Sequence, residues 1–155
     1  MMELVQGEGG VNPLQADYVR QVAALCRERD WLLLIDEVQT GIGRTGTLFA
    51  WQQFGIEPDV VSFAKGIASG LPFGGFLVNA KCRGVLTPGS TFGANPIAAA
   101  AGNVVLDTLT DEFLEEVRQK GQYLREKIEA MDSPYTNGVR GLGMMLGVGV
   151  KLTFF

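Results

Sequence analysis

Lys65 has the surroundings that most clearly suggest chemistry. It follows the apolar segment 60–64 and is the only charged residue between Val60 and Asn79. An amine in apolar surroundings is disfavoured in its charged form, and the neutral amine is a nucleophile. Such a lysine can form a Schiff base with a carbonyl compound or with pyridoxal phosphate (PLP). The alternative is a strand-end lysine whose ammonium group simply reaches solvent.

Two adjacent acids, Asp36 and Glu37, follow the apolar segment 31–35. One of these carboxylates could pair with the positively charged ring nitrogen of PLP, which makes the ring an electron sink. The alternative roles are a helix N-cap or a salt bridge with Arg44. Because an acid and Lys65 end consecutive predicted strands, we expect both to face one crevice.

Two further segments carry polar or glycine motifs. Ser90 and Thr91 precede a predicted helix start, where hydroxyl groups and free amides favour a phosphate, although a capping turn is the simpler alternative. Residues 41–46 match the GxGxxG pattern of dinucleotide sites. In such sites the first glycine follows the strand almost directly, and an acid ends the next strand. Here residues 36–40 intervene and the next strand ends in Lys65, which disfavours nucleotide binding.

Strands that alternate with helices are expected to position these residues. The continuous apolar segments 31–35 and 60–64 are typical of strands buried on both faces of a parallel sheet. Asn95 followed by Pro96 predicts a helix start with Asn95 as N-cap. The other predicted elements are a strand end at 4–6, a glycine turn at 7–10, helices at 14–29, 48–54, 95–109 and 111–131, and strands at 73–79, 139–140 and 145–150. This pattern predicts an α/β fold with a mostly parallel sheet, in which ligands sit beyond the carboxyl ends of the strands.

The composition excludes several classes of protein. The chain has 155 residues, of which 46% are hydrophobic, and a net charge of −4 without any basic cluster, so neither nucleic-acid nor membrane binding is expected. It has no histidine, which removes histidine-based triads and metal sites, and no metal is expected. Cys26 and Cys82 are interpreted as free thiols of a reducing compartment. No signal peptide and no apolar segment near the roughly 20 residues of a membrane helix are present, so a cytoplasmic protein is predicted.

Four motifs of the chain, taken together, resemble those of a known family. They are QGEGGV at 6–11, DEVQTG at 36–41, SFAKGI followed by GLP at 62–72, and STFGANP at 90–96. In this order they resemble the class III (ornithine-type) PLP-dependent aminotransferases, most of all the acetylornithine-type members. The resemblance implies that the chain is a fragment of a fold-type I PLP-transferase. Residues 1–110 would be the C-terminal half of the PLP-binding large domain, with a mostly parallel sheet flanked by helices. Residues 111–155 would be the linking helix and the truncated start of the small C-terminal domain.

The resemblance assigns the PLP-binding residues position by position. Lys65 would form the internal aldimine and then carry the proton between Cα and C4′. Asp36, beside Glu37, would keep the pyridinium nitrogen protonated. Val38 would pack on the ring face, and Gln39 would reach the ring hydroxyl group.

Other residues would act across a subunit interface or on the substrate. Thr91 would bind the PLP phosphate of the neighbouring subunit, so the active site would be shared in a homodimer. Ser90 would lie near the substrate, and Glu8 corresponds to a glutamate that pairs with an arginine gating the substrate carboxylate. Here Pro88 and Gly89 run directly into Ser90, whereas the family has a few more residues, including a histidine, at this place.

The reaction that the resemblance implies is transfer of the δ-amino group of N-acetylornithine to 2-oxoglutarate, a step of arginine biosynthesis. Ornithine, succinylornithine and 4-aminobutyrate aminotransferases and aminomutases share the four motifs and remain alternatives. The family segments that supply the phosphate-binding glycine turn and the substrate-binding arginines lie outside the matched region. An inactive fragment is therefore the alternative from another class.

Overall fold

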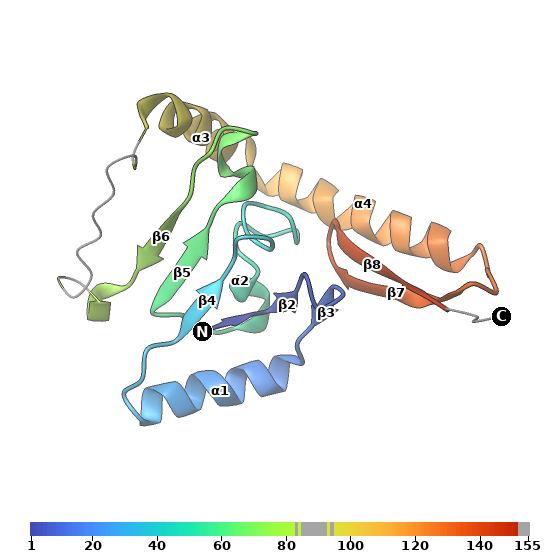
Figure 1. Cartoon of the computed structure of the whole chain (residues 1–155), viewed down its shortest axis with the longest axis horizontal. Helices are drawn as coiled ribbons and strands as arrows, with labels where there is room; N and C mark the ends of the chain where they lie inside the picture. The colour runs from blue at the N-terminus through green and yellow to red at the C-terminus, as the bar shows by residue number, and fades with distance from the viewer. Residues whose placement is uncertain (83, 85–92, 94, 152–155) are drawn as a thin grey trace.

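Alternating strands and helices make up the part of the chain that the computed structural model describes, residues 1–82, 84, 93 and 95–151 (Figure 1). In chain order they are β1 (Met2–Glu3), β2 (Val5–Gln6), β3 (Asn12–Pro13), α1 (Ala16–Glu28), β4 (Leu34–Asp36), α2 (Trp51–Phe54), β5 (Val60–Phe63), the 3₁₀ helix η1 (Lys65–Ala68), β6 (Gly75–Val78), the 3₁₀ helix η2 (Ala80–Cys82), α3 (Pro96–Thr108), α4 (Asp111–Glu129), β7 (Thr136–Leu142) and β8 (Met145–Val150). None of these helices is long and apolar enough to cross a membrane.

A four-stranded sheet, ordered β1-β4-β5-β6, carries the residues that the sequence marks for chemistry. Strands β1, β4 and β5 are parallel, and β6 pairs antiparallel to β5 at the edge. The mostly parallel sheet of an α/β fold is therefore confirmed. The parallel register sets Asp36, the last residue of β4, beside Ser62 near the end of β5.

A hydrophobic core forms where helices α1 and α2 pack against this sheet. Helical spacing puts Val19 and Ala23 on one face of α1, and both are buried. The buried residues of the core are Leu4, Val19, Ala23, Leu33, Ile35, Ala50, Phe54 and Ile56. Because β4 and the start of α2 both contribute, the core fixes these two elements relative to each other.

The apolar segment 31–35 is buried only in part. Trp31 and Leu32 are 57% and 41% exposed, and strand β4 begins only at Leu34. The chain leaves α1 through Asp30, whose φ is 53°, in a turn that the Trp31 amide closes onto the helix. The prediction of a strand buried over all five residues is therefore wrong, because the first two belong to the turn after α1.

Helix α3 begins as the sequence predicts. The side-chain oxygen of Asn95 accepts hydrogen bonds from the amides of Ile97 at 2.9 Å and Ala98 at 3.4 Å. Pro96 occupies the first helical position, where a missing amide hydrogen costs nothing. Thr110 caps α4 through its hydroxyl group in the same way.

The two-stranded sheet β7–β8 packs along α4, to one side of the main sheet (Figure 1). Gly121 of α4 and Gly143 of the hairpin turn meet backbone to backbone, and a Cβ at position 121 would overlap the carbonyl oxygen of Gly143. Arg125 of α4 donates hydrogen bonds to the carbonyl groups of Val139 at 2.6 Å and Gly141 at 2.9 Å. The hairpin is thus fastened to α4 at its turn and along β7.

Candidate active site

Lys65 lies where β5 passes into η1. Strand β5 ends at Phe63, and Lys65 begins η1 with a φ of 52°, in the left-handed region. Its side chain is exposed, so the apolar surroundings that the segment 60–64 suggested for the amine are not observed. The turn into η1 carries the lysine past the end of the strand, whereas full burial is confined to Val60 and Val61 within it.

Asp36 is the last residue of β4, and only one of its two carboxylate oxygens accepts hydrogen bonds from described residues. Its Oδ1 accepts hydrogen bonds from the Val38 amide at 2.9 Å and the Ser62 hydroxyl at 3.2 Å. Among the described residues, nothing donates to its Oδ2, and no ion pair joins it to Arg44. The prediction that Asp36 and Lys65 lie at the carboxyl ends of adjacent parallel strands is confirmed.

A cavity of about 350 Å³ opens beside Lys65. Four parts of the chain form its walls, namely the β2–β3 turn, the turn after β4, η1 and the β7–β8 hairpin. The lining residues are Val11, Val38, Gln39, Gly41, Ile42, Arg44, Lys65, Gly66, Met144, Met145 and Leu146. The cavity thus brings Lys65, Val38 and Gln39 together, and Asp36 directly precedes this turn. Its size lies within the range of small-molecule sites, about 300–1,000 Å³.

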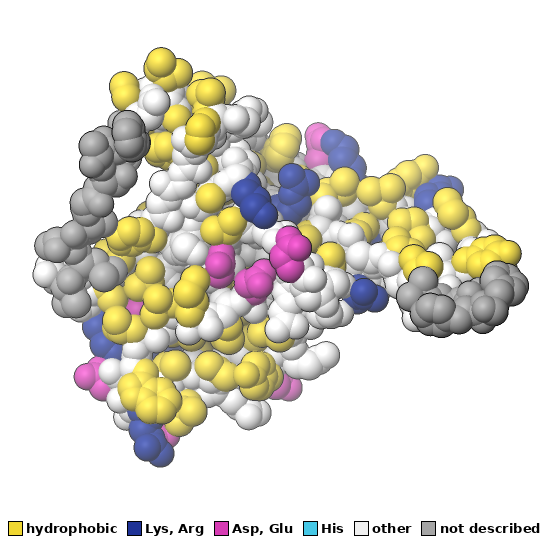
Figure 2. Space-filling view, in the orientation of Figure 1, with side chains coloured by type: hydrophobic (Ala, Val, Ile, Leu, Met, Phe, Trp, Pro, Cys, Tyr) yellow, Lys and Arg dark blue, Asp and Glu magenta, His cyan; other side chains and the backbone are white. Residues whose placement is uncertain are grey.

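Glu8 and Gln39 contact each other beside this cavity. The Gln39 Nε2 donates a hydrogen bond to the Glu8 Oε1 at 3.3 Å. Gly7 lies so close that a Cβ there would come within 2.6 Å of the Gln39 side chain. Figure 2 shows acidic and basic side chains gathered near the centre of the face drawn. The β2–β3 turn therefore holds the Gln39 side chain in place.

Backbone strain gathers at the same cavity. Six described residues other than glycine have a positive φ, and three of them line it: Val11 at 57°, Ile42 at 56° and Lys65 at 52°. This conformation is unfavourable for any side chain and most of all for the β-branched Val11 and Ile42. Such strain costs about 1–3 kcal/mol per residue and clusters at functional sites. The backbone thus marks this cavity independently of the sequence motifs.

The β7–β8 hairpin supplies a wall that sequence reasoning missed. Met144, Met145 and Leu146 line the cavity, and the Met144 amide donates to the Arg44 carbonyl at 3.0 Å. These side chains are apolar and belong to no chemical motif. The only sequence signal for Met145 and Leu146 is the apolar segment 145–150, which indicates a strand and not a site, and Met144 lies just before it.

Glu37 is buried away from the cavity and has another role. It is 0% exposed, and its carboxylate accepts hydrogen bonds from the Thr40 hydroxyl at 2.5 Å and the amides of Ala50 at 3.0 Å and Trp51 at 2.8 Å. Burial raises the pKa of Glu37, and these three hydrogen bonds oppose the rise. The carboxylate of Glu37 therefore points into the fold and not into the cavity, and these contacts give no support to the prediction that Glu37 binds the cofactor.

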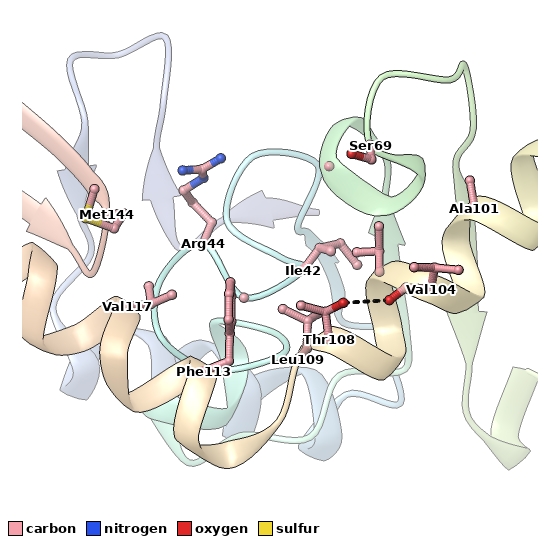
Figure 3. A pocket seen from close by; sticks show the side chains of 13 residues that line it. Ile42, Arg44, Ser69, Ala101, Val104, Thr108, Leu109, Phe113, Val117 and Met144 are labelled. Atoms are coloured by element: carbon pink, nitrogen blue, oxygen red, sulfur yellow. Dashed lines mark hydrogen bonds between the residues drawn. The ribbon is translucent and has the colours of Figure 1, made fainter.

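A larger, mostly apolar cavity of about 630 Å³ adjoins the first (Figure 3). It lies between the loop 41–46, η1, α3 and α4. The residues that it shares with the smaller cavity are Ile42, Arg44, Gly66 and Met144. Among its described lining residues only Arg44 is charged. The smaller cavity is the candidate active site, because it adds the amine of Lys65 and lies beside the end of β4 that carries Asp36.

The GxGxxG segment packs closely against Leu109 and helix α4. Gly43 and Gly46 have positive φ angles of 81° and 93°. A Cβ on Gly43 would come within 2.7 Å of Leu109, and a Cβ on Gly46 would overlap Arg118. Arg118 also donates a hydrogen bond to the Gly46 carbonyl. These glycines allow the loop to approach α4 closely, which agrees with the argument against dinucleotide binding.

Two predicted site residues, Ser90 and Thr91, lie outside the described residues. The same is true of Pro88 and Gly89, which precede them in the shortened segment. The assignment of Ser90 to the substrate and of Thr91 to the PLP phosphate therefore stays a prediction.

Comparison with known sequences gives consistent matches over almost the whole chain. The family model described as aminotransferase class-III matches residues 1–153. The acetylornithine aminotransferase of Haemophilus ducreyi is 52% identical over 151 residues, which are 96% of this chain and 38% of that protein. The chain is thus similar to one segment of a longer enzyme.

Solved structures agree with this comparison. The N-acetylornithine aminotransferase of Stenotrophomonas maltophilia superposes with a TM-score of 0.87 and 38% identity, covering 96% of this chain and 40% of that one. The taurine:2-oxoglutarate aminotransferase of Bifidobacterium kashiwanohense, solved in complex with PLP and glutamate, gives a TM-score of 0.88 and 32% identity, covering 96% of this chain and 35% of that one. The chain spans less than half the length of each of these proteins.

Proposed function

Because the chain belongs to the class III aminotransferases, we propose that the complete protein is a PLP-dependent enzyme that transfers the δ-amino group of N-acetylornithine to 2-oxoglutarate. The relative at 52% identity is an acetylornithine aminotransferase, which favours this amino donor over others in the class. The same reaction would place the protein in arginine biosynthesis.

The described residues fit a pyridoxal group. Lys65, Val38 and Gln39 border one cavity of about 350 Å³ and offer an amine, an apolar side chain and an amide. Asp36 adds a carboxylate whose Oδ1 is held by two hydrogen bonds, while its Oδ2 meets no donor among the described residues. An amine to bind the aldehyde and an acid to face the ring nitrogen are the groups that this cofactor requires.

When bound, PLP supplies an electron sink for the negative charge that forms as the amino-bearing carbon of the substrate loses a proton. Lys65 would hold the cofactor covalently through Nζ and, once released, would carry that proton. The charge of Asp36 would keep the ring nitrogen protonated, because a neighbouring opposite charge favours the charged form. Val38 would press on one ring face, and the Gln39 amide would bind the ring hydroxyl group.

The remaining assignments rest on the family resemblance and form part of the same proposal. Thr91 would contact the PLP phosphate of a neighbouring subunit in a cytoplasmic homodimer, and Ser90 and Glu8 would lie near the substrate. Residues 1–110 would belong to the large PLP-binding domain, and residues 111–155 would begin the small domain.

One observation carries the proposal: side chains from two consecutive strand-to-helix connections, Val38 with Gln39 and then Lys65, line a single cavity. Asp36 is the last residue of β4, the parallel neighbour of β5, so its carboxylate lies at the same edge of the sheet as Lys65. The order of motifs along a chain does not require this convergence, so it supports the proposal independently.

Addition of PLP to the full-length protein tests the cofactor role of Lys65. We expect a visible absorbance band that borohydride removes and that is lost in Lys65→Ala. Lys81→Ala is the matched control, because Lys81 is an exposed lysine that pairs with Asp30 away from the cavity. A full-length protein without the band would refute the proposal. Competition among N-acetylornithine, ornithine and 4-aminobutyrate as amino donors then tests the substrate.

We also propose that the 155-residue chain alone has little activity, because it spans less than half the length of the aminotransferases that it matches. The same absorbance assay applied to this chain tests the point. A band as strong as that of the full-length protein, with equal turnover, would contradict it.

A further inference from the structure

Glu37 joins three elements of the fold at one residue. Its amide donates to the Ser62 carbonyl of β5 at 2.9 Å, and its own carbonyl accepts from the Gly41 amide at 2.9 Å. Its carboxylate reaches α2, where it accepts from the amides of Ala50 at 3.0 Å and Trp51 at 2.8 Å. The backbone amide of Glu37 thus connects the end of β4 to β5, its carbonyl group to the following turn, and its carboxylate to the start of α2.

A carboxylate is costly to bury unless several donors hold it. Glu37 is 0% exposed, and the Thr40 hydroxyl gives it a third donor at 2.5 Å. A well-packed apolar side chain in a buried position generally stabilises a fold at least as well as a buried charge. The carboxylate at this place therefore indicates a need for a defined geometry more than a need for stability.

The neighbours of Glu37 in the chain are the residues proposed to hold the cofactor ring. Asp36 precedes it, and Val38 and Gln39 follow it. Ala50, which donates to the carboxylate, belongs to the hydrophobic core. The carboxylate therefore links the rigid core to the turn that faces the cavity.

We propose that Glu37 is a positioning residue: it clamps the end of β4, with Asp36, and the following turn, with Gln39, to the start of α2 without touching the cofactor itself. This inference rests on the proposed function. A merely structural role would lower the stability of the protein and leave the ligand-binding properties of the folded protein unchanged. A positioning role changes those properties while the protein remains folded.

Three variants of the full-length protein separate these roles. Glu37→Ala removes all three acceptor contacts. Glu37→Gln keeps one acceptor oxygen but turns an amide group toward a backbone donor, so it retains only part of the clamp. Glu57→Gln makes the same chemical change at an exposed glutamate shortly after α2 and is the matched control.

The main measurement is titration of each apo-protein with PLP, at a temperature where thermal denaturation shows it to be folded. We expect the dissociation constant to rise about tenfold in Glu37→Ala, as when a residue supporting a ligand-binding side chain is lost. The rise should be smaller in Glu37→Gln, and Glu57→Gln should stay within about twofold of wild type. In the apo-protein, hydrogen exchange at the Val38 and Gly41 amides should be faster in Glu37→Ala.

A folded Glu37→Ala protein with wild-type PLP affinity and wild-type exchange at this turn would overturn the inference. If the alanine variant does not fold, Glu37→Gln decides, and an unchanged dissociation constant in it would overturn the inference equally. A wild-type protein that shows no borohydride-sensitive band would reject the proposed function instead, so the two failures are distinguishable.

Discussion

Replacing Gly121 with alanine should destabilise the protein, although alanine is the better helix former. Gly121 lies inside α4, where the change from glycine to alanine is worth about 1 kcal/mol in favour of the helix. The new Cβ would lie 3.0 Å from the Gly143 Cα and would overlap the Gly143 carbonyl oxygen. These are backbone atoms of a hairpin turn, so neither can rotate away.

The balance of these two effects sets the size of the change. Overpacking in a rigid site costs about 1–3 kcal/mol, and a backbone partner puts this contact at the upper end. After subtraction of the helix term, we expect a net loss of about 2 kcal/mol in the free energy of unfolding.

Urea denaturation followed by tryptophan fluorescence measures this loss, with Gly102→Ala as the matched control. Gly102 also lies inside a helix, α3, and a Cβ there would be 3.4 Å from the nearest atom, the Ile67 carbonyl oxygen. That distance leaves room for a methyl group, so Gly102→Ala should be neutral or stabilise the protein by up to about 1 kcal/mol. The two variants should therefore shift in different directions.

A Gly121→Ala variant as stable as wild type would refute the reasoning, because it would mean that α4 and the hairpin turn separate at little cost. Equal destabilisation by both variants would also refute it, since the loss would then come from a property common to helical glycines and not from the contact with Gly143.

Three further predictions follow from individual contacts. Burial raises the pKa of Glu37 above its ordinary value of 4.5, so this residue contributes stability that is fully present below pH 4.5 and is lost as the pH rises through its folded pKa. The melting temperature of Glu37→Gln relative to wild type should therefore increase as the pH is raised above 4.5, and a constant difference would contradict the assigned shift. Asn95→Ala should remove the cap of α3 and cost about 1 kcal/mol in urea denaturation, while Asn95→Asp should keep most of it; identical midpoints for the two variants would count against the cap. Asp36→Asn in the full-length protein should keep an acceptor for Val38 and Ser62 but lower kcat about a hundredfold, whereas the exposed control Asp17→Asn should not; equal kcat values would remove Asp36 from the proposed site.

The predictions that the structure confirms came from local sequence patterns. A short apolar segment ending in Asp36 and another ending before Lys65 indicated two buried parallel strands, and the register confirms that they are neighbours. The Asn95–Pro96 helix start is also a local signal, because the cap needs only amides two and three residues further along the chain.

Contacts between distant segments account for what the sequence did not reveal. Glu37 looked like a partner of Asp36 in ligand binding, but its partners lie thirteen and fourteen residues away at the start of α2. The exposure of Lys65 depends on the turn into η1, which an apolar run cannot indicate. Met144 reaches the cavity only because a hairpin docks on α4, and no local pattern encodes that docking.

The cavity beside Lys65 is assembled from Val11 near one end of the chain, Lys65 in the middle and Met144 near the other end. Contacts of such long sequence separation form slowly, because loop-closure entropy must be overcome before they bring any gain. The pocket is therefore complete only when both ends of the chain have docked on its middle part. A ligand that binds there stabilises only the fully assembled state, so it should slow unfolding more than it speeds folding.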